Sequence, residues 1–176
     1  VIIYSQTDAL TFTGYNKFCY SIESNNKQKI KGSLNMEKEK SRFLKSADGT
    51  IYDSQTSLTW MANDSRIDLE KDVSWDETEK YAENMNGKSF GGHSDWRIPS
   101  GQEALSLFDK NKLNKDFKGG DIHLDSVFSP GAGNTTWTSE TRGGEAQIIF
   151  YINGLPYWYV KDDKTLSHSV RLIRRD

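Results

Sequence analysis

The sequence predicts an α+β fold in which two helices pack on antiparallel sheets. Strand signals occupy both ends of the 176-residue chain and two helix signals lie between them, an order that differs from the alternation of α/β proteins. The length suits a single core. Aromatic residues make up 12% of the chain, and their large side chains compensate for an apolar fraction of only 35%.

The first part of the chain is predicted to be a strand and charged-loop segment, residues 1–41, which packs on a main domain of residues 42–176. Apolar and polar side chains alternate within residues 1–22, as they do in short strands. The charged stretch 23–42 then indicates a solvated loop or hairpin. A polyanion-binding arm is the alternative, although glutamates dilute its lysines.

Two capping-box patterns predict the two helices. Ser74 with Glu77, and Ser100 with Glu103, have the spacing in which a serine caps the helix and a glutamate three residues later bonds back to it. Apolar side chains recur at helical spacing after each box. The first helix is expected to end at an Asn-Gly pair and the second near Asn111.

The last third of the chain predicts a hairpin and a closing strand. The runs 147–152 and 155–160 flank an Asn-Gly dipeptide, which is the strongest short hairpin signal. Pro156 indicates that the second arm is an edge strand or begins after the turn. Residues 169–174 are predicted to form the final strand.

Two segments carry a resemblance to a known family. The first is SRFLKSADGTIYDSQTSLTW at 41–60 and the second is GGHSDWRIPSGQEALSLFD at 91–109. Together with a Trp that opens the first helix, a WTS triplet and a terminal VRLIR run, they resemble the Lcl C-terminal domain family, named after the globular head of a bacterial collagen-like adhesin. The matching residues are Arg42, Phe43, Asp48, Gly49, Thr50, Asp53, Thr56, Leu58, Trp60, Trp75, Gly92, Ser94, Asp95, Trp96, Arg97, Pro99, Glu103, Leu105, Trp137, Thr138, Ser139, Val170, Arg171, Ile173 and Arg174.

The resemblance implies a C-type-lectin-like fold and a secreted or cell-surface bacterial domain that serves in adhesion. Glycans, notably sulfated glycosaminoglycans, are among the ligands of the best-known member. The expected partner is therefore a glycan or another host or surface macromolecule. The formal net charge of −2 argues against assuming the sulfated specificity here, because that affinity depends on concentrated positive charge.

The chain departs from the family pattern at three positions. Ser57 stands where the family usually has Gly. Ala82 and Leu172 stand where members often carry a cysteine in the first helix and another in the last strand. The paired loss of both cysteines predicts that these two side chains lie close together in the core. Cys19 is the only cysteine, so an intramolecular disulfide is excluded.

The SDWRIP run is interpreted as structural. Trp96 and the following Ile anchor an extended segment in the core, while Pro99 disfavours helix before the Ser100 cap. Asp95 and Arg97 are expected to pair with neighbouring side chains or backbone groups at this joint.

Several classes of function are not expected from this composition. The net charge gives no basic field for nucleic acid, and no run of about 18 apolar residues is present for membrane insertion. The three histidines are scattered, and no phosphate-binding glycine loop or nucleophile elbow is present. We therefore expect a protein that is not an enzyme and has no cofactor, with a glycosidase-like carboxylate pair left open.

Calcium is the one metal ion for which the sequence offers candidate ligands. Asn63, Asp64 and Asp68, followed by Asp72, place oxygen ligands within one stretch. Their spacing matches no EF-hand, and a solvated acidic loop is the alternative.

A ligand-binding surface is expected in the last third of the chain. An exposed aromatic beside hydroxyl, amide and guanidinium groups suits a sugar, and a core position is the alternative for either Trp of the set. The C-terminal arginines could add a basic strip for sulfate groups. An oligomerisation or protein–protein interaction module, with a homo-oligomer among its forms, is the alternative function. The candidate ligand-binding residues are Trp137, Arg142, Tyr157, Trp158, Tyr159, Arg171 and Arg174.

Overall fold

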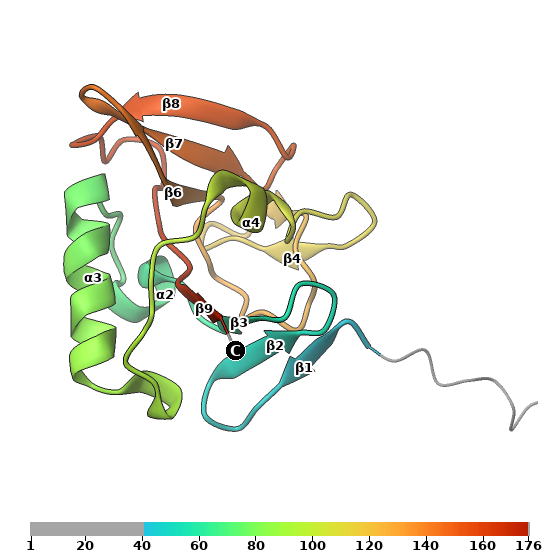
Figure 1. Ribbon diagram of the computed structural model, residues 1–176. Helices are drawn as coiled ribbons and strands as arrows, with labels where there is room; N and C mark the ends of the chain where they lie inside the picture. Colours follow the sequence, from blue (N-terminus) through green and yellow to red (C-terminus); the bar gives the residue numbers. More distant parts are fainter. Residues whose placement is uncertain (1–40, 176) are drawn as a thin grey trace, which may run out of the picture. The chain divides into compact units, whose positions relative to one another are not determined.

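The fold combines three α-helices with three antiparallel sheets, counted over residues 41–175, which are the residues that the computed structural model describes (Figure 1). The α+β class is confirmed, with one helix more than the two expected. The predicted strands of residues 1–22, the charged stretch as far as residue 40 and the packing of the N-terminal segment lie outside the described residues.

The first sheet contains four strands in the order β1-β2-β3-β9. Arg42 donates two hydrogen bonds to the buried carboxylate of Asp53, which also accepts bonds from Gln55 and Thr56 and so fixes the turn between β2 and β3. The strands are β1 Phe43–Lys45, β2 Thr50–Asp53, β3 Leu58–Met61 and, from the end of the chain, β9 Ile173–Arg175.

The final strand is shorter than predicted. Residues 169–172 are buried, but their backbone groups bond to three different neighbours. Ser169 O accepts from Trp137 N, Val170 O from Ser65 N and Leu172 O from Met61 N. Because no single strand runs alongside them, a regular ladder forms only at β9.

The three helices are α2 Ser65–Leu69, α3 Trp75–Gly87 and α4 Gly101–Leu105, with a short 3-10 helix at Phe90–Gly92. Both predicted capping boxes are present, at Ser74 with Glu77 and at Ser100 with Glu103. Helix α4 ends well before Asn111, since Asp109 N donates to His123 O and draws the chain away from the helix axis.

The predicted hairpin is present, but its turn is longer than the two-residue Asn-Gly turn expected: Phe150 N donates to Leu155 O, so residues 151–154 form the connection. Strand β6 Thr135–Arg142 pairs with β7 Glu145–Phe150, and β7 pairs with β8 Pro156–Val160, in the order β6-β7-β8. A register shift interrupts the pairing of β6 with β7 between Trp137 and Thr141. A two-stranded sheet, β4 Asn114–Lys115 with β5 Asp121–Ile122, lies in the long connection before β6.

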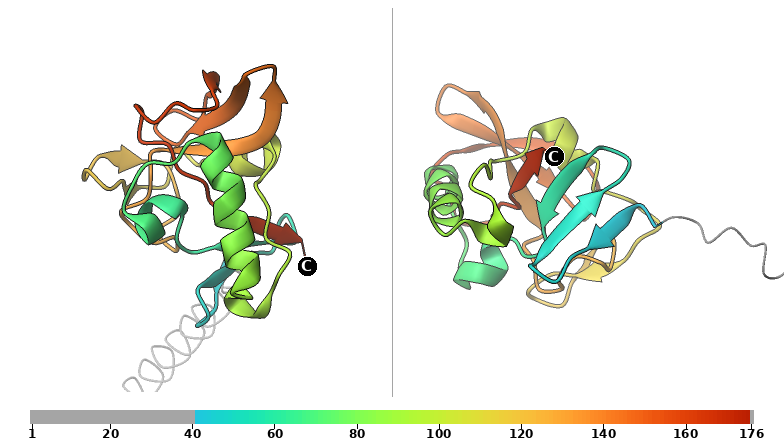
Figure 2. Two further views of the ribbon diagram at one scale, coloured as in Figure 1. Left: turned by 90° about the vertical axis from the view of Figure 1, so that its left-hand side faces the viewer. Right: turned by 60° about the horizontal axis from the view of Figure 1, so that its bottom comes forward.

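The two larger sheets lie at opposite ends of the domain, and α3 runs along one side between them (Figures 1 and 2). Two apolar clusters fill the interior. Ala82 and Leu172 are both buried members of one cluster, in agreement with the prediction that they lie together in the core. Within residues 41–175 no helix is long and apolar enough to cross a membrane.

Candidate functional site

The SDWRIP segment joins α3, β9 and α4. The amide side chain of Asn86 bonds both backbone groups of Trp96, at 2.7 and 2.9 Å. Arg97 pairs its backbone with Ile173 and directs its guanidinium to both carboxylate oxygens of Glu103, at 2.8 and 2.7 Å. Pro99 is buried. These contacts are internal, so the segment serves the fold.

Two predicted ligand-binding side chains lie inside the protein. Trp137 is 0% exposed, donates from its indole nitrogen to Val73 O and packs on His168 at 4.7 Å between ring centroids. Arg171 is 1% exposed; its Nη1 donates to Met61 O and Ala62 O. Neither side chain reaches a ligand at the surface.

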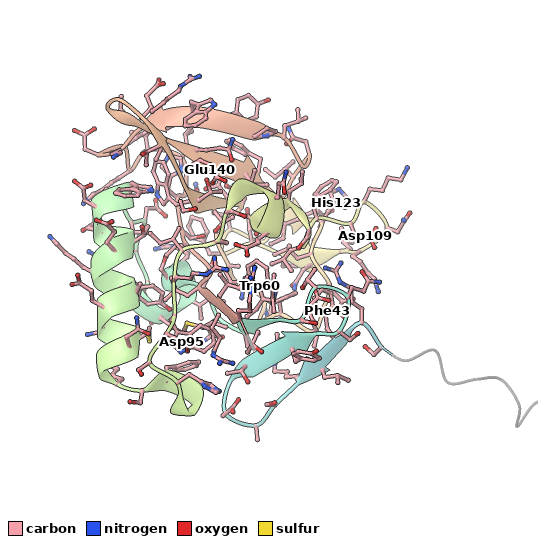
Figure 3. All side chains as sticks on the ribbon, viewed as in Figure 1. Phe43, Trp60, Asp95, Asp109, His123 and Glu140 are labelled. Carbon is pink, nitrogen blue, oxygen red and sulfur yellow. The ribbon has the colours of Figure 1, made fainter. Side chains whose placement is uncertain are left out.

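The predicted basic strip for sulfate groups is therefore not formed as expected. Arg171 is buried beneath the surface, with its guanidinium 4.8 Å from the ring centroid of Phe128. Arg174 forms an ion pair with Asp95, at 2.9 Å between Nε and Oδ1 (Asp95 is labelled in Figure 3). Arg171 thus contributes to internal packing, and Arg174 is held in an ion pair at the surface.

The aromatic residues of β8 are divided between the two faces of the sheet. Trp158 stands opposite Gln147 of β7, whereas Tyr157 and Tyr159 stand opposite Ile148 and Ala146. Because successive side chains of a strand point to opposite faces, the tyrosines lie on the face that carries the core. Trp158 lies on the other face.

Arg142 and Trp158 form the surface contact that remains from the predicted set. The Arg142 guanidinium lies 4.3 Å from the centroid of the Trp158 ring, and its Nε is 2.8 Å from Glu145 Oε2. Arg142 stands opposite Glu145 in the sheet, so its side chain crosses β7 to reach β8. We call Arg142, Glu145, Gln147 and Trp158 the Arg142–Trp158 surface.

The start of helix α4 borders this surface. Gly101 N donates to both carboxylate oxygens of Glu140, which Figure 3 labels beside the helix. A Cβ atom at Gly101 would come within 2.1 Å of Gln147 Oε1. A glycine at this position therefore lets the helix approach the sheet closely enough to hold the glutamine side chain.

The stretch predicted as a possible calcium loop contains α2 instead. Asp64 caps this helix, and its carboxylate accepts bonds from Ile67 N, Gly133 N and Ser169 Oγ. Burial raises the pKa of Asp64 despite the nearby charge of Arg171. Asp68 accepts hydrogen bonds from two side chains, those of Asn63 and Tyr81.

These carboxylates therefore already have protein partners. In the part of the chain that the structure describes, no group of three His, Cys, Asp or Glu side chains is placed to hold a metal ion.

Two open depressions flank α3. One, of about 480 Å³, is lined by Glu79, Ala82, Glu83, Trp96, Arg97, Ile98 and Ser139. The other, of about 420 Å³, is called the lysine groove here. It is lined by Leu69, Lys71, Val73, Glu77, Lys80, Tyr81, Asn84 and Lys88.

Sequence reasoning missed the lysine groove. Lys80, Asn84 and Lys88 recur every four residues along α3, a spacing that places side chains on one helix face. Lys71 comes from the preceding loop and bonds Glu77 Oε1 at 3.1 Å. The four-residue spacing was the available signal, but isolated lysines on a polar helix are ordinarily solvated.

The chain belongs to the Lcl C-terminal domain family, whose model matches residues 49–174. This match covers both the Arg142–Trp158 surface and the lysine groove. Comparisons with curated proteins and with solved structures gave no match. The family assignment defines a domain of the surface-protein class, as expected from the two sequence segments that carry the resemblance.

Proposed function

We propose that this domain is a non-catalytic module of a secreted or cell-surface bacterial protein, with a C-type-lectin-like fold, and that it binds a glycan at the Arg142–Trp158 surface. The observation that carries the proposal is the stack of the exposed Arg142 guanidinium on the half-buried ring of Trp158. Where Arg142 does not cover it, the indole supplies a flat apolar area against which a sugar ring can pack. Guanidinium, carboxylate and amide groups beside it supply directional hydrogen bonds.

The geometry favours a prearranged site. Glu145 holds the guanidinium of Arg142 through a 2.8 Å ion pair, and Arg142 in turn covers the Trp158 ring. Gln147 stands opposite Trp158 and is bounded by α4. A ligand that uses these groups has few side chains to immobilise, which limits the entropy lost on binding.

Negatively charged groups on the glycan would find a complement in the lysine groove. Its lining includes Lys71, Lys80 and Lys88. This groove replaces the C-terminal arginines as the location for salt-sensitive binding. The proposal therefore assigns uncharged sugar units to the Arg142–Trp158 surface and anionic groups to the lysine groove.

A non-catalytic role is consistent with the two glutamates whose pKa values are lowered most clearly. A backbone hydrogen bond from Ser74 helps to lower the pKa of Glu77 to about 2, and hydrogen bonds from Arg97 do the same for Glu103. Both glutamates belong to capping boxes. Their low pKa values thus follow from structural roles.

The test is a glycan-array screen of the 176-residue chain, run with calcium, with EDTA, and at low and raised salt. Substitution Trp158→Ala should weaken binding of the strongest ligand by at least about tenfold, because a central aromatic anchor is lost. Tyr157→Ala is the matched control, since it truncates an exposed aromatic on the opposite face of the same strand. Equal binding by Trp158→Ala and the wild type would refute the assigned site.

The salt and calcium arms test the remaining assignments. Binding that weakens at raised salt should also weaken in Lys80→Glu, but not in the control Lys110→Glu, which changes an exposed lysine outside the groove. Binding that disappears in EDTA would move the site toward the Asn63–Asp68 region. Absence of binding under every condition would contradict direct glycan recognition.

A second function, protein–protein interaction within a larger surface protein, is favoured by a separate observation. Strand β8 is the outer strand of its sheet in residues 41–175, and uncovered strand edges can pair with another chain.

A further inference from the structure

Within residues 41–175, no strand pairs with the outer edge of β8. Lys161 N donates to Gly144 O and Phe150 N donates to Leu155 O, on either side of the strand. Because alternate residues of an antiparallel strand bond to the same neighbour, Tyr157 and Tyr159 direct their backbone groups to β7. Residues 156, 158 and 160 direct theirs away from it.

The strand carries only one feature that commonly prevents edge pairing, the proline at its first position. Its sequence, Pro-Tyr-Trp-Tyr-Val, has no charged residue, whereas natural edge strands often carry a lysine or another charge. Pro156 is the first residue, so it interrupts only one end. Tyr157 is 42% exposed and Val160 is 53% exposed, so the edge also presents apolar surface.

The pattern of donors and acceptors along this edge is complementary to itself. We propose that two copies of the chain associate through antiparallel pairing of their β8 strands, with a two-fold axis at Trp158. In this register each Trp158 N–H donates to the partner's Trp158 carbonyl. Each Val160 N–H donates to the carbonyl of the partner's Pro156. The register therefore forms four hydrogen bonds between the two copies, two at Trp158 and two between Val160 and Pro156.

Pro156 is compatible with this register even though it has no N–H group. The remaining pair in this register would need an N–H at Pro156 opposite the Val160 carbonyl, and proline has none. The Val160 carbonyl already accepts a hydrogen bond from Asp163 N at 3.1 Å. The missing donor thus faces an acceptor that is already satisfied, and no group is left unpaired.

The side chains are compatible with the same register. The Trp158 side chains of the two copies would be direct cross-strand neighbours on one face, and Tyr157 would oppose the partner's Tyr159 on the other. Aromatic cross-strand pairs stabilise sheets. The charged residues that follow Val160 would lie toward the partner's turn at 152–155, which contains no charged side chain. Like charges therefore do not oppose the pairing.

The assembly would be a continuous six-stranded sheet with a closed two-fold interface. Both Arg142–Trp158 surfaces would lie on the same face of that sheet, on either side of the axis. A ligand with repeating units could then engage both copies, which raises the apparent affinity through effective concentration. The pairing itself does not depend on the identity of the ligand.

The first experiment is sedimentation equilibrium of the 176-residue chain over a wide concentration range. We expect a reversible monomer–dimer equilibrium starting from the 20.1 kDa chain. Val160→Pro removes an outward N–H without removing a bond to β7. It should raise the dissociation constant by at least about tenfold, since symmetry removes two inter-chain hydrogen bonds. Val160→Ala, which keeps the N–H, is the control and should remain a dimer.

Hydrogen exchange provides a readout that needs no substitution. The amides of Trp158 and Val160 should become protected as the protein concentration rises, whereas the Tyr159 amide, which faces β7, should be protected at every concentration. A chain that stays monomeric up to about millimolar concentration would overturn the proposal. So would a dimer whose dissociation constant is unchanged by Val160→Pro, or whose Trp158 and Val160 amides exchange equally fast at all concentrations.

Discussion

At the scale of single residues, the two candidate ligand-binding tryptophans differ in burial: the structure buries Trp137 completely and leaves Trp158 half-buried. Trp137 is set among threonines, and polar neighbours usually indicate exposure. The structure buries those threonines together with the indole. Their hydroxyl groups bond within the protein; for example, Thr138 Oγ1 donates to Gln147 O at 3.1 Å. Hydroxyl-rich flanks therefore did not distinguish a core position from a binding position.

Ser57 stands where the family usually has Gly, and its backbone conformation explains the usual preference for glycine at this position. It lies in the turn between β2 and β3 with φ of 55°, a left-handed conformation that favours glycine. Ser57→Gly should relieve the contact between Cβ and the backbone. We expect the free energy of unfolding to rise by up to about 1 kcal/mol, measured by urea denaturation.

The matched control for this substitution is Ser126→Gly. Ser126 is also exposed, but its φ is not positive. Glycine there only increases the freedom of the unfolded chain, so a loss of several tenths of a kcal/mol is expected. Equal changes in the two variants would show that the backbone conformation at residue 57 does not limit stability.

At the scale of elements, Glu103 connects the start of α4 with the SDWRIP segment. Hydrogen bonds from Arg97, together with one from Ser100 N, lower the pKa of Glu103 to about 2 from a usual value of 4.5. A carboxylate with a lowered pKa in the folded state stabilises the fold above its unfolded pKa, and this contribution is lost as the pH falls through the folded pKa. The affected window is therefore pH 4.5 to 2.

Substitution Glu103→Gln should remove roughly 2 kcal/mol of stability at pH 7 and leave less to lose on acidification. Denaturant unfolding at pH 7, 4.5 and 2.5 measures both effects. Glu79→Gln, on the exposed side of α3, controls for the loss of one surface charge. If Glu103→Gln and the wild type lose the same stability between pH 4.5 and 2, Glu103 does not supply the acid-sensitive contribution.

The sequence predicted correctly those elements whose stabilising hydrogen bonds join residues close together in the chain. The two capping boxes and the Asn-Gly hairpin were found because their hydrogen bonds join residues within a few positions. Helix α2, the early end of α4 and the short β9 depend on partners far along the chain, such as His123 for Asp109. The lysine groove likewise combines α3 with a preceding loop. Such features require the tertiary arrangement.

At the scale of the whole molecule, the C-terminal segment 167–173 organises the domain. All seven residues are buried. Val170 and Leu172 belong to the cluster beside α3, whereas Ile173 belongs to the other cluster. Because this segment bonds to β3, α2 and β6 in turn, it links the elements that come before it. The sequence predicted a final strand over residues 169–174, and the pattern gives no indication of this central position.

The cysteine pair of the family can be used to test the position of this segment. Ala82 of α3 and Leu172 are buried in the same cluster, so Ala82→Cys with Leu172→Cys should form a disulfide. The closed loop spans about 90 residues, for which a stabilisation of roughly 2–4 kcal/mol is typical, reduced here by the smaller side chain at position 172. Thermal unfolding with and without a reductant measures the gain.

Peptide mapping by mass spectrometry distinguishes the expected bridge from pairing with Cys19. The double variant should yield a peptide that links positions 82 and 172, while Cys19 remains a free thiol. Leu172→Cys alone should be less stable than the wild type, because the shorter side chain leaves a cavity in the core. A double variant that keeps three free thiols under oxidising conditions would mean that α3 and the C-terminal segment do not meet at these positions. The central placement of that segment, on which both apolar clusters depend, would then be wrong.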